Sequence, residues 1–381
     1  MIYLDNAATT LIKPEGVKLA IADALDHCGN SGRGAYRDAM NAADIVYGAR
    51  EKIAKLFGVG SAENVVFTHN ATHALNIAIK GIAKKGHCVI SGYEHNSVLR
   101  PIEKLSRQGI ISYSVARGAL FNPEGIIKAF LKSIKRETEF CVFTHVSNVF
   151  GYILPIYEID RICLRYGIPL IIDASQSAGS VPLNMSELRA TVCICAPGHK
   201  GLYGPQGTGI LLCEGGEKLD SLTEGGTGSL SSDKVQPGFL PDRHESGTLN
   251  THGIAGLSAG IDYINSRGVR NILKYERELI RFAARELSKL KDIKTFYSAD
   301  INQQSGVLSF LSSEIKNEQL ADMLAKENVA VRSGLHCSPL SHETAGTKNG
   351  TVRISVSDFT TEKDITDFVE IMRKIVSEKK Y

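Results

Sequence analysis

The amino-acid sequence predicts an α/β protein in which a large domain with a mostly parallel central sheet is joined to a smaller α+β domain. From about Val65 to Cys213, short β-branched runs alternate with amphipathic segments of helical length, a pattern typical of βαβ units. Beyond about residue 253 the helices become longer and more charged. Because 381 residues exceed the usual size of one core, we expect a large domain at residues 15–252 and a small domain formed by residues 1–14 and 253–381.

The expected strands of the large sheet are the apolar runs NVVFTH, HCVISG, GIISYSVAR, EFCVFTHVS, IPLIIDAS, TVCICAP and TGILLCE. Helical segments separate most of them, from ATHALNIAIKGIAKKG to IYEIDRICLRYG. Upstream, apolar residues recur at a helical period from Ala39 to Phe57, and Gly58 ends that helix. In the small domain we expect the long helix NILKYERELIRFAARELSKLK, strands SGVLSFL, VAVRSG and TVRISVS, and a last helix from Thr361.

The composition is that of an ordinary globular protein, with 43% hydrophobic and 22% charged residues. A net charge of +3 gives no electrostatic reason to expect a nucleic-acid or membrane partner. No apolar run is long enough to predict a spanning helix. The opening MIYLDNAATT has neither a basic leader nor an apolar signal core, so we expect a cytoplasmic protein.

The eight cysteines are scattered and include no CxxC pair, so no metal site is expected. Several lie in strand-like runs, as small core residues of a protein in a reducing compartment do. Cys337 differs, because it lies in the loop-like stretch RSGLHCSP together with the cations Arg332 and His336. Positive neighbours and partial exposure favour a reactive thiolate. A polar loop that happens to contain a cysteine fits this stretch equally well.

Two polar side chains follow predicted strands of the large sheet. Asp173 ends the run PLIID, and Lys200 follows CICAP in a glycine-rich loop. Taken singly, Asp173 is most simply a helix cap and Lys200 a solvated surface residue. Together they are more specific, because ligands bind at the carboxyl ends of parallel strands. A pyridoxal phosphate enzyme needs this pair: a lysine that bonds to the cofactor aldehyde and a carboxylate that keeps the pyridine ring protonated.

Motifs of one known family extend over nearly the whole chain: YLDNAATT, YEHNS, DASQ, GHK, RSGLHCSP and TVRISVS. The sequence resembles the class V, fold-type I pyridoxal phosphate enzymes, specifically the cysteine desulfurases and the selenocysteine lyase-like proteins. RSGLHC is similar to the R-x-G-x-H-C pattern of the second desulfurase group, whose cysteine loop is short and well ordered. The resemblance implies a fold-type I PLP-dependent transferase with pyridoxal 5'-phosphate as its cofactor.

The resemblance also implies roles around the cofactor ring. Lys200 in GHK matches the lysine that bonds to the cofactor, and Asp173 in DASQ matches the partner of the ring nitrogen. Gln176 matches the residue that hydrogen-bonds the phenolic oxygen of the cofactor. His95 in YEHNS matches the histidine that stacks on the ring and assists proton transfer.

Thr72 and His199 match residues on the phosphate side of the cofactor, and Thr72 opens a helix whose N-terminus attracts anions. Two positions depart from the family pattern. Pro197 replaces a serine, and proline offers neither a hydroxyl nor an amide hydrogen to the phosphate. His73 follows Thr72 where the family has a TTE-like sequence, so His73 either adds positive charge beside the phosphate or faces solvent.

Further matches concern the substrate and a second subunit. Asn148 and Arg353 match the pair that holds the substrate carboxylate, for which a planar guanidinium is well suited. Arg33 lies where the family has a basic segment near the mouth of the site. Thr248, in HESGTLNT, matches a threonine that reaches the phosphate of the neighbouring subunit. That last match implies a homodimer with shared active sites.

By resemblance, Lys200 moves the substrate α-proton, and Cys337 attacks the sulfur of L-cysteine and keeps it as a persulfide while L-alanine is formed. A sulfur-acceptor protein or thiol then takes the sulfur by exchange. The same scaffold tuned to L-selenocysteine is the nearest alternative. An aminotransferase or epimerase of the same class would not need RSGLHC. A cysteine hydrolase built from Cys337 and His336 is disfavoured, because adjacent side chains on extended backbone point apart.

Overall fold

The structure, a computed structural model, describes residues 1–32 and 34–378. Its large sheet has strand order β2-β8-β7-β6-β5-β3-β4. Strand β8 runs antiparallel to both β2 and β7, and the remaining pairs are parallel. All the apolar runs expected for this sheet form its strands, which confirms the mostly parallel α/β architecture. The strands are β2 (Val65–Thr68), β3 (Gly86–Ser91), β4 (Ile111–Ala116), β5 (Thr138–Thr144), β6 (Leu170–Asp173), β7 (Thr191–Pro197) and β8 (Gly209–Cys213).

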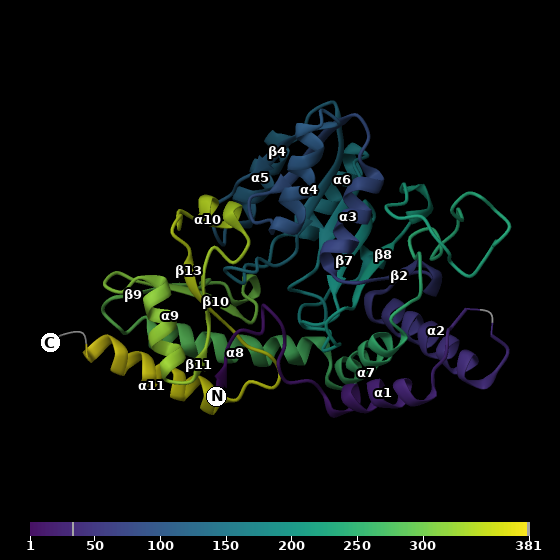
Figure 1. The fold of residues 1–381 in the computed structure, drawn as a ribbon. Coiled ribbons are helices and arrows are strands. Elements are labelled where there is room, and N and C mark those ends of the chain that lie inside the picture. Colours follow the sequence, from purple (N-terminus) through teal and green to yellow (C-terminus); the bar gives the residue numbers. More distant parts are fainter. Residues whose placement is uncertain (33, 379–381) are drawn as a thin grey trace.

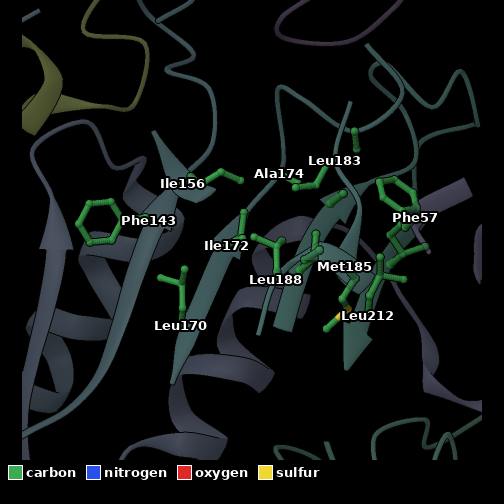
Figure 2. Packing of buried hydrophobic residues seen from close by; sticks show 14 of the residues in the cluster. Phe57, Phe143, Ile156, Leu170, Ile172, Ala174, Leu183, Met185, Leu188 and Leu212 are labelled. Atoms are coloured by element: carbon green, nitrogen blue, oxygen red, sulfur yellow. The ribbon is translucent and has the colours of Figure 1, made fainter. Parts of the chain in front are cut away.

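Helices cover both faces of this sheet (Figure 1). The central strand β5 shows why, since Phe140 and Val142 join one buried cluster while Cys141 and Phe143 join another. Helices α3 (Ala71–Ile82) and α4 (Asn96–Arg107) complete the first cluster. Helices α5 (Pro123–Ser133) and α6 (Ile156–Tyr166) contribute to the second, part of which is shown in Figure 2. Strands buried on both faces therefore read as continuous apolar runs in the sequence.

Three further helices lie below the large sheet in Figure 1. Helix α2 (Arg37–Phe57) is followed by Gly58, which confirms the predicted end of this helix; Gly58 caps it with a left-handed φ of 64°. Helices α1 (Glu15–His27) and α7 (Thr251–Arg267) pack on each other, and α7 also packs on α2. Helix α7 crosses the expected boundary at residue 252, and its Ile254, Leu257 and Ile261 join the core of the large sheet. The division of the chain into domains stays a prediction.

A second sheet has the antiparallel order β12-β13-β10-β9. Strand β1 pairs in parallel with β11, and Leu4 joins the core beneath the second sheet. The N-terminal residues therefore pack with the C-terminal part of the chain. None of the described helices is long and apolar enough to cross a membrane. The elements of this region are β1 (Ile2–Tyr3), α8 (Val269–Leu287), β9 (Ile293–Phe296), β10 (Val307–Ser312), α9 (Asn317–Lys326), β11 (Val329–Ala330), β12 (Arg332–Gly334), α10 (Pro339–Ala345), β13 (Thr351–Ser355) and α11 (Glu362–Glu378).

Candidate active site

A cavity of about 230 Å³ opens where the parallel strands β5, β6 and β7 end, as expected for a ligand site in an α/β sheet. Thr144, Asp173 and Pro197 are the last residues of these strands and line the cavity. Residues of the second sheet close it from the other side. The structure thereby brings together most of the site residues expected from the sequence: Thr72, His95, Asn148, Asp173, Gln176, His199, Lys200 and Arg353.

Lys200 follows β7 and keeps part of its surface open to the cavity. Burial lowers the pKa of the Lys200 amine to about 8, and the charges of Arg353 and Arg332 act in the same direction while Asp173 opposes them. A larger fraction of this amine is therefore neutral near pH 7 than for an exposed lysine, and a neutral amine is the form that attacks an aldehyde. Asp173 is buried, and its Oδ1 accepts a hydrogen bond from the backbone N–H of Ser175 (2.9 Å).

His95 lies at the N-cap of α4, and its Nδ1 accepts the backbone N–H of Ser97 (3.0 Å). Burial lowers the pKa of His95 to about 4; Asp173 opposes this, whereas the nearby cations reinforce it. His95 is consequently neutral at physiological pH.

Glu94, the residue before His95, is buried, and its Oε1 accepts the backbone N–H of Thr144 (2.7 Å). Burial raises the pKa of Glu94 to about 8, so this carboxyl is largely protonated at pH 7.

The first turn of α3 meets the cavity at Asn70, Ala71 and Thr72. Asn70 caps the helix by accepting the backbone N–H of His73 (2.9 Å), and the Thr72 hydroxyl lies 2.8 Å from that of Ser97. Free backbone N–H groups and the helix dipole make such a terminus suited to a phosphate. His199 lines the same cavity with its Nδ1 3.0 Å from the Thr9 hydroxyl.

These groups match what pyridoxal phosphate requires. A lysine amine of lowered pKa and a buried carboxylate line one cavity with the N-terminus of a three-turn helix. Gln176 is held at the same wall, where its Nε2 donates to the carbonyl of Ala7 (2.9 Å). The donor set therefore fits an aldehyde, a protonated ring nitrogen and a phosphate within one site.

Arg353, on β13, is almost fully buried. Its Nη2 donates to Asp5 Oδ1 (2.7 Å) and its Nη1 to the carbonyl of Asn148 (2.8 Å). Its Nε has no hydrogen-bond partner among the described residues. Asp5 belongs to the motif YLDNAATT but is not among the site residues expected from the sequence. The only signal for it was that motif, because the two residues are 348 positions apart.

Cys337 lies in a short loop between β12 and α10, with its side chain exposed. Nη2 of Arg332 is 3.7 Å from its Sγ. His336 is instead buried, and its Nε2 donates to the carbonyl of Thr351 (3.1 Å). Burial, reinforced mainly by the charge of Arg353, lowers the pKa of His336 to about 2. His336 is therefore neutral. Of the two cations that the sequence suggested beside the thiol, only Arg332 provides a positive charge.

Among the described residues, three expected site residues do not line this cavity: Cys337, His73 and Thr248. His73 and Thr248 line a different cavity of about 460 Å³. His73 is half-buried there and stacks on His69, with ring centroids 5.0 Å apart, so it does not line the Lys200 cavity. Arg33 lies outside the described residues. Across residues 1–32 and 34–378, no group of three or more His, Cys, Asp or Glu side chains is placed to hold a metal ion.

Comparison with known proteins gives a consistent result. Residues 2–368 match the family model described as Aminotransferase class-V. The chain is 32% identical to a probable cysteine desulfurase of Methanothermobacter thermautotrophicus, covering 98% of this chain and 94% of that protein. It is 31% identical to a probable cysteine desulfurase of Halalkalibacterium halodurans, covering 98% and 93%.

Solved structures agree with the sequence comparison. A cysteine desulfurase from Thermococcus onnurineus, solved in its apo form, superposes with a TM-score of 0.92 at 28% identity, covering 99% of this chain and 94% of that one. An Escherichia coli cysteine desulfurase at 24% identity has a TM-score of 0.88 over 99% and 94% of the two chains, which shows the shared fold. Because one family model spans nearly the whole sequence and full-length relatives share its fold, this protein belongs to the class-V aminotransferase family, among the cysteine desulfurases.

Proposed function

We propose that this protein converts L-cysteine to L-alanine and keeps the released sulfur as a persulfide on Cys337, with pyridoxal 5'-phosphate bound in the Lys200 cavity. The observation that carries this proposal is the position of Arg332. Its side chain lines the cavity of Lys200, and its Nη2 lies 3.7 Å from the Cys337 thiol. Arg332 therefore connects the loop that carries Cys337 with the cavity of Lys200.

Several residues are suited to hold the cofactor. Lys200 would bond to its aldehyde, and Asp173 would pair with its protonated ring nitrogen. His95 and Gln176 would contact the ring, while Thr72, His199 and the N-terminus of α3 would bind its phosphate. When bound, pyridoxal phosphate supplies a ring that withdraws electrons and stabilises negative charge at the substrate α-carbon.

Arg353 is the group best suited to the substrate carboxylate. Its guanidinium lines the cavity and is oriented by Asp5 and by the carbonyl of Asn148. Its buried Nε has no hydrogen-bond partner in the described part of the chain, so it can donate to an incoming carboxylate without breaking an existing bond. Lys200 is placed to take the α-proton on its Nζ and return a proton to the product, since its lowered pKa brings it near physiological pH.

The sulfur step needs the thiolate of Cys337. Its Sγ attacks the substrate sulfur, so that an S–S bond forms while the bond between the substrate's β-carbon and sulfur breaks. The electron pair of the broken bond passes to the carbon chain, which takes up a proton to become L-alanine. L-cysteine and the Cys337 thiol thus yield L-alanine and a Cys337 persulfide, with no other oxidant or reductant. The guanidinium of Arg332, with its Nη2 3.7 Å from Sγ, provides a positive charge beside the attacking sulfur.

The sulfur then passes to an acceptor protein or thiol, and the exposure of Cys337 supports this step because exchange requires access to the sulfur. We further propose that the protein acts as a homodimer with shared active sites. Thr248 is exposed and lies away from the Lys200 cavity, which fits a residue that serves the phosphate of the neighbouring subunit.

The test is alanine release from L-cysteine by the wild type, Cys337→Ala and Lys200→Ala, with Cys28→Ala as a matched control. Cys28 is half-buried and lies after α1, away from the Lys200 cavity. We expect Cys28→Ala to keep full activity and the other two variants to lose it. Lys200→Ala should also lose the visible absorbance of the lysine-bound cofactor.

L-selenocysteine assayed in parallel separates the nearest alternative. If only L-selenocysteine yields alanine and Cys337→Ala remains active, the protein is a selenocysteine lyase and the role of Cys337 is wrong. No alanine from either substrate would refute both activities.

A further inference from the structure

The loop that carries Cys337 has an unusual backbone. His336 and Cys337 both have positive φ, at 50° and 58°. Left-handed backbone is unfavourable for residues with a Cβ, and two such residues in succession persist only where the surrounding structure holds them. The direction of the thiol depends on these two residues. The contacts that hold the loop therefore decide where the thiol points.

Asn148 makes the two side-chain contacts that bracket Cys337. Its Nδ2 donates to the carbonyl of His336 (2.8 Å), and its Oδ1 accepts the hydroxyl of Ser338 (2.6 Å). Asn148, His336 and Ser338 are all buried. The loss of a buried hydrogen bond is costly in free energy, because it leaves a polar group unpaired away from water. Two further backbone bonds hold the loop, from Asn96 N–H to the carbonyl of Cys337 (2.8 Å) and from Ser338 N–H to that of Leu335 (2.9 Å).

Asn148 also contacts the substrate side of the cavity. Its backbone carbonyl accepts Nη1 of Arg353, the guanidinium assigned to the substrate carboxylate. One residue thus connects the carboxylate-binding group to both flanks of the thiol. One N–H of the Asn148 amide and its Oδ1 are engaged with the loop, and the amide nitrogen carries a second N–H beyond these loop contacts. These contacts with the loop are additional to the carboxylate binding implied by the family resemblance.

We propose that Asn148 is a positioning residue for the sulfur step: through His336 and Ser338 it holds Cys337 in its left-handed conformation, with the thiol beside Arg332 at the Lys200 cavity. The proposal rests on the proposed function, since it assigns the geometry of the thiol that receives the sulfur. A thiol held this way is placed to attack, whereas a loosened loop loses rate without losing substrate binding.

Two reactions of the holoenzyme separate this role from substrate binding. Alanine release from L-cysteine requires both Lys200 and the Cys337 thiol. Exchange of the α-proton of L-alanine with solvent deuterium requires Lys200 and the carboxylate site but no thiol. The variants are Asn148→Ala and Ser338→Ala, with Ser341→Ala as the matched control. Ser341 is equally buried and lies three residues beyond Ser338, but its hydroxyl has no hydrogen-bond partner among the described residues.

For Asn148→Ala we expect kcat for alanine release to fall roughly 10- to 100-fold, as for a misplaced reacting group. Ser338→Ala should lower kcat by a smaller factor, because it removes only the bond between Ser338 and Asn148. Asn148→Ala already lacks this bond, so the double variant should be no slower than Asn148→Ala. Ser341→Ala should match the wild type. KM for L-cysteine and the exchange of L-alanine should change less than about twofold in all variants. Equal losses in exchange and release for Asn148→Ala, with a raised KM, would overturn the proposal in favour of carboxylate binding.

Amide hydrogen exchange gives a second reading that does not depend on activity. We expect the amides of Asn96 and Ser338 to exchange faster in Asn148→Ala than in Ser341→Ala, because their bonds hold the same loop. Unchanged protection would overturn the proposal. If the wild type released no alanine from L-cysteine, the proposed function would fail, and this exchange experiment would still decide whether Asn148 holds the loop.

Discussion

Cys337 and His336 are neighbours in the chain, yet their side chains have opposite surroundings. The thiol is exposed and lies 3.7 Å from the guanidinium of Arg332. The imidazole is buried, hydrogen-bonded to the carbonyl of Thr351 and neutral because burial lowers its pKa to about 2. Both residues have positive φ, at 50° and 58°. The thiol therefore depends on Arg332 for a neighbouring positive charge.

This arrangement predicts different effects for the two basic residues. Arg332→Ala should slow alkylation of Cys337 by iodoacetamide at pH 7 by about twofold to fivefold, the size of a partly exposed charge interaction. His336→Gln keeps an amide donor for the Thr351 carbonyl. Its alkylation rate should equal that of the wild type at each pH between 5 and 8. The rate is read at the Cys337 peptide by mass spectrometry. A slower reaction in His336→Gln together with no effect in Arg332→Ala would reverse the assignment.

At the scale of single elements, the end of α2 shows how local sequence and tertiary contact combine. Gly58 caps α2 with a φ of 64°, and a Cβ at this position would collide with the side chain of Asn184. Gly109 has nearly the same φ, 70°, but a Cβ there would meet no atom within 4 Å. Comparing Gly58 with Gly109 therefore separates two free-energy costs of a Cβ: the left-handed backbone and the collision with a neighbouring side chain.

Alanine substitution at these glycines should therefore have unequal effects on stability. Gly109→Ala should lower the free energy of unfolding by about 1 kcal/mol, the cost of a left-handed residue with a Cβ. Gly58→Ala should lower it by roughly 2 kcal/mol or more, because Asn184 must also move. Urea denaturation followed by circular dichroism measures both. Equal losses would mean that the Asn184 side chain adjusts freely.

At the scale of the whole molecule, the cavity exists only because the large sheet and the second sheet meet. Buried histidines lie close to this junction: burial lowers the pKa of His145 to about 3 and that of His342 to about 4. Their pKa in the folded protein is below the unfolded value near 6.5. Below about pH 6.5 the unfolded chain therefore binds protons that the folded protein does not. The stability they contribute is complete above that pH and is lost as the pH falls.

His145 offers the sharpest test of this acid sensitivity, since it is buried and its Nδ1 has no partner among the described residues. Between pH 6 and 4 the free energy of unfolding should fall less steeply in His145→Gln, by about 1.4 kcal/mol per pH unit relative to the wild type. His27→Gln, at an exposed histidine, should keep the wild-type slope. Urea denaturation across this pH range measures the difference, and identical slopes in all three proteins would contradict a neutral buried His145.

The proposed dimer makes a prediction about two chains together. Glu245, three residues before Thr248, forms a buried bidentate pair with Arg50 (2.8 and 2.6 Å), which anchors the segment that presents Thr248 at the surface. If Thr248 serves the partner's phosphate, a hybrid of one Lys200→Ala chain and one Thr248→Asp chain has one site with both lesions and one intact site.

Such a hybrid should recover about half of the wild-type activity, although both parent homodimers should be nearly inactive. In the Thr248→Asp homodimer, the introduced carboxylate repels the cofactor phosphate. Tagged chains purified as the hybrid and assayed for alanine release give the measurement, with light scattering to verify that each protein is a dimer. An inactive hybrid would place Thr248 in the site of its own chain.

Local pattern was enough for the strands of the large sheet, the end of α2 and the candidates Asp173 and Lys200. Apolar runs, a glycine after a helical period and polar residues after strands are signals contained in a few neighbouring positions. Helix α1 was missed, because its two buried residues, Val17 and Ala24, leave only a weak helical period. The family motifs added the remaining cofactor residues, which no local pattern distinguishes from ordinary surface positions.

The sequence by itself determined the α/β class, the family and most of the expected site residues that line the Lys200 cavity. The tertiary structure alone decided which polar atoms meet: Asp5 with Arg353, Asn148 with both flanks of Cys337, and His73 in a cavity with Thr248 rather than with Lys200. The physical reason is that hydrogen bonds and charge interactions act over a few ångströms in space. They join residues far apart in the chain, whereas secondary structure is specified by neighbours.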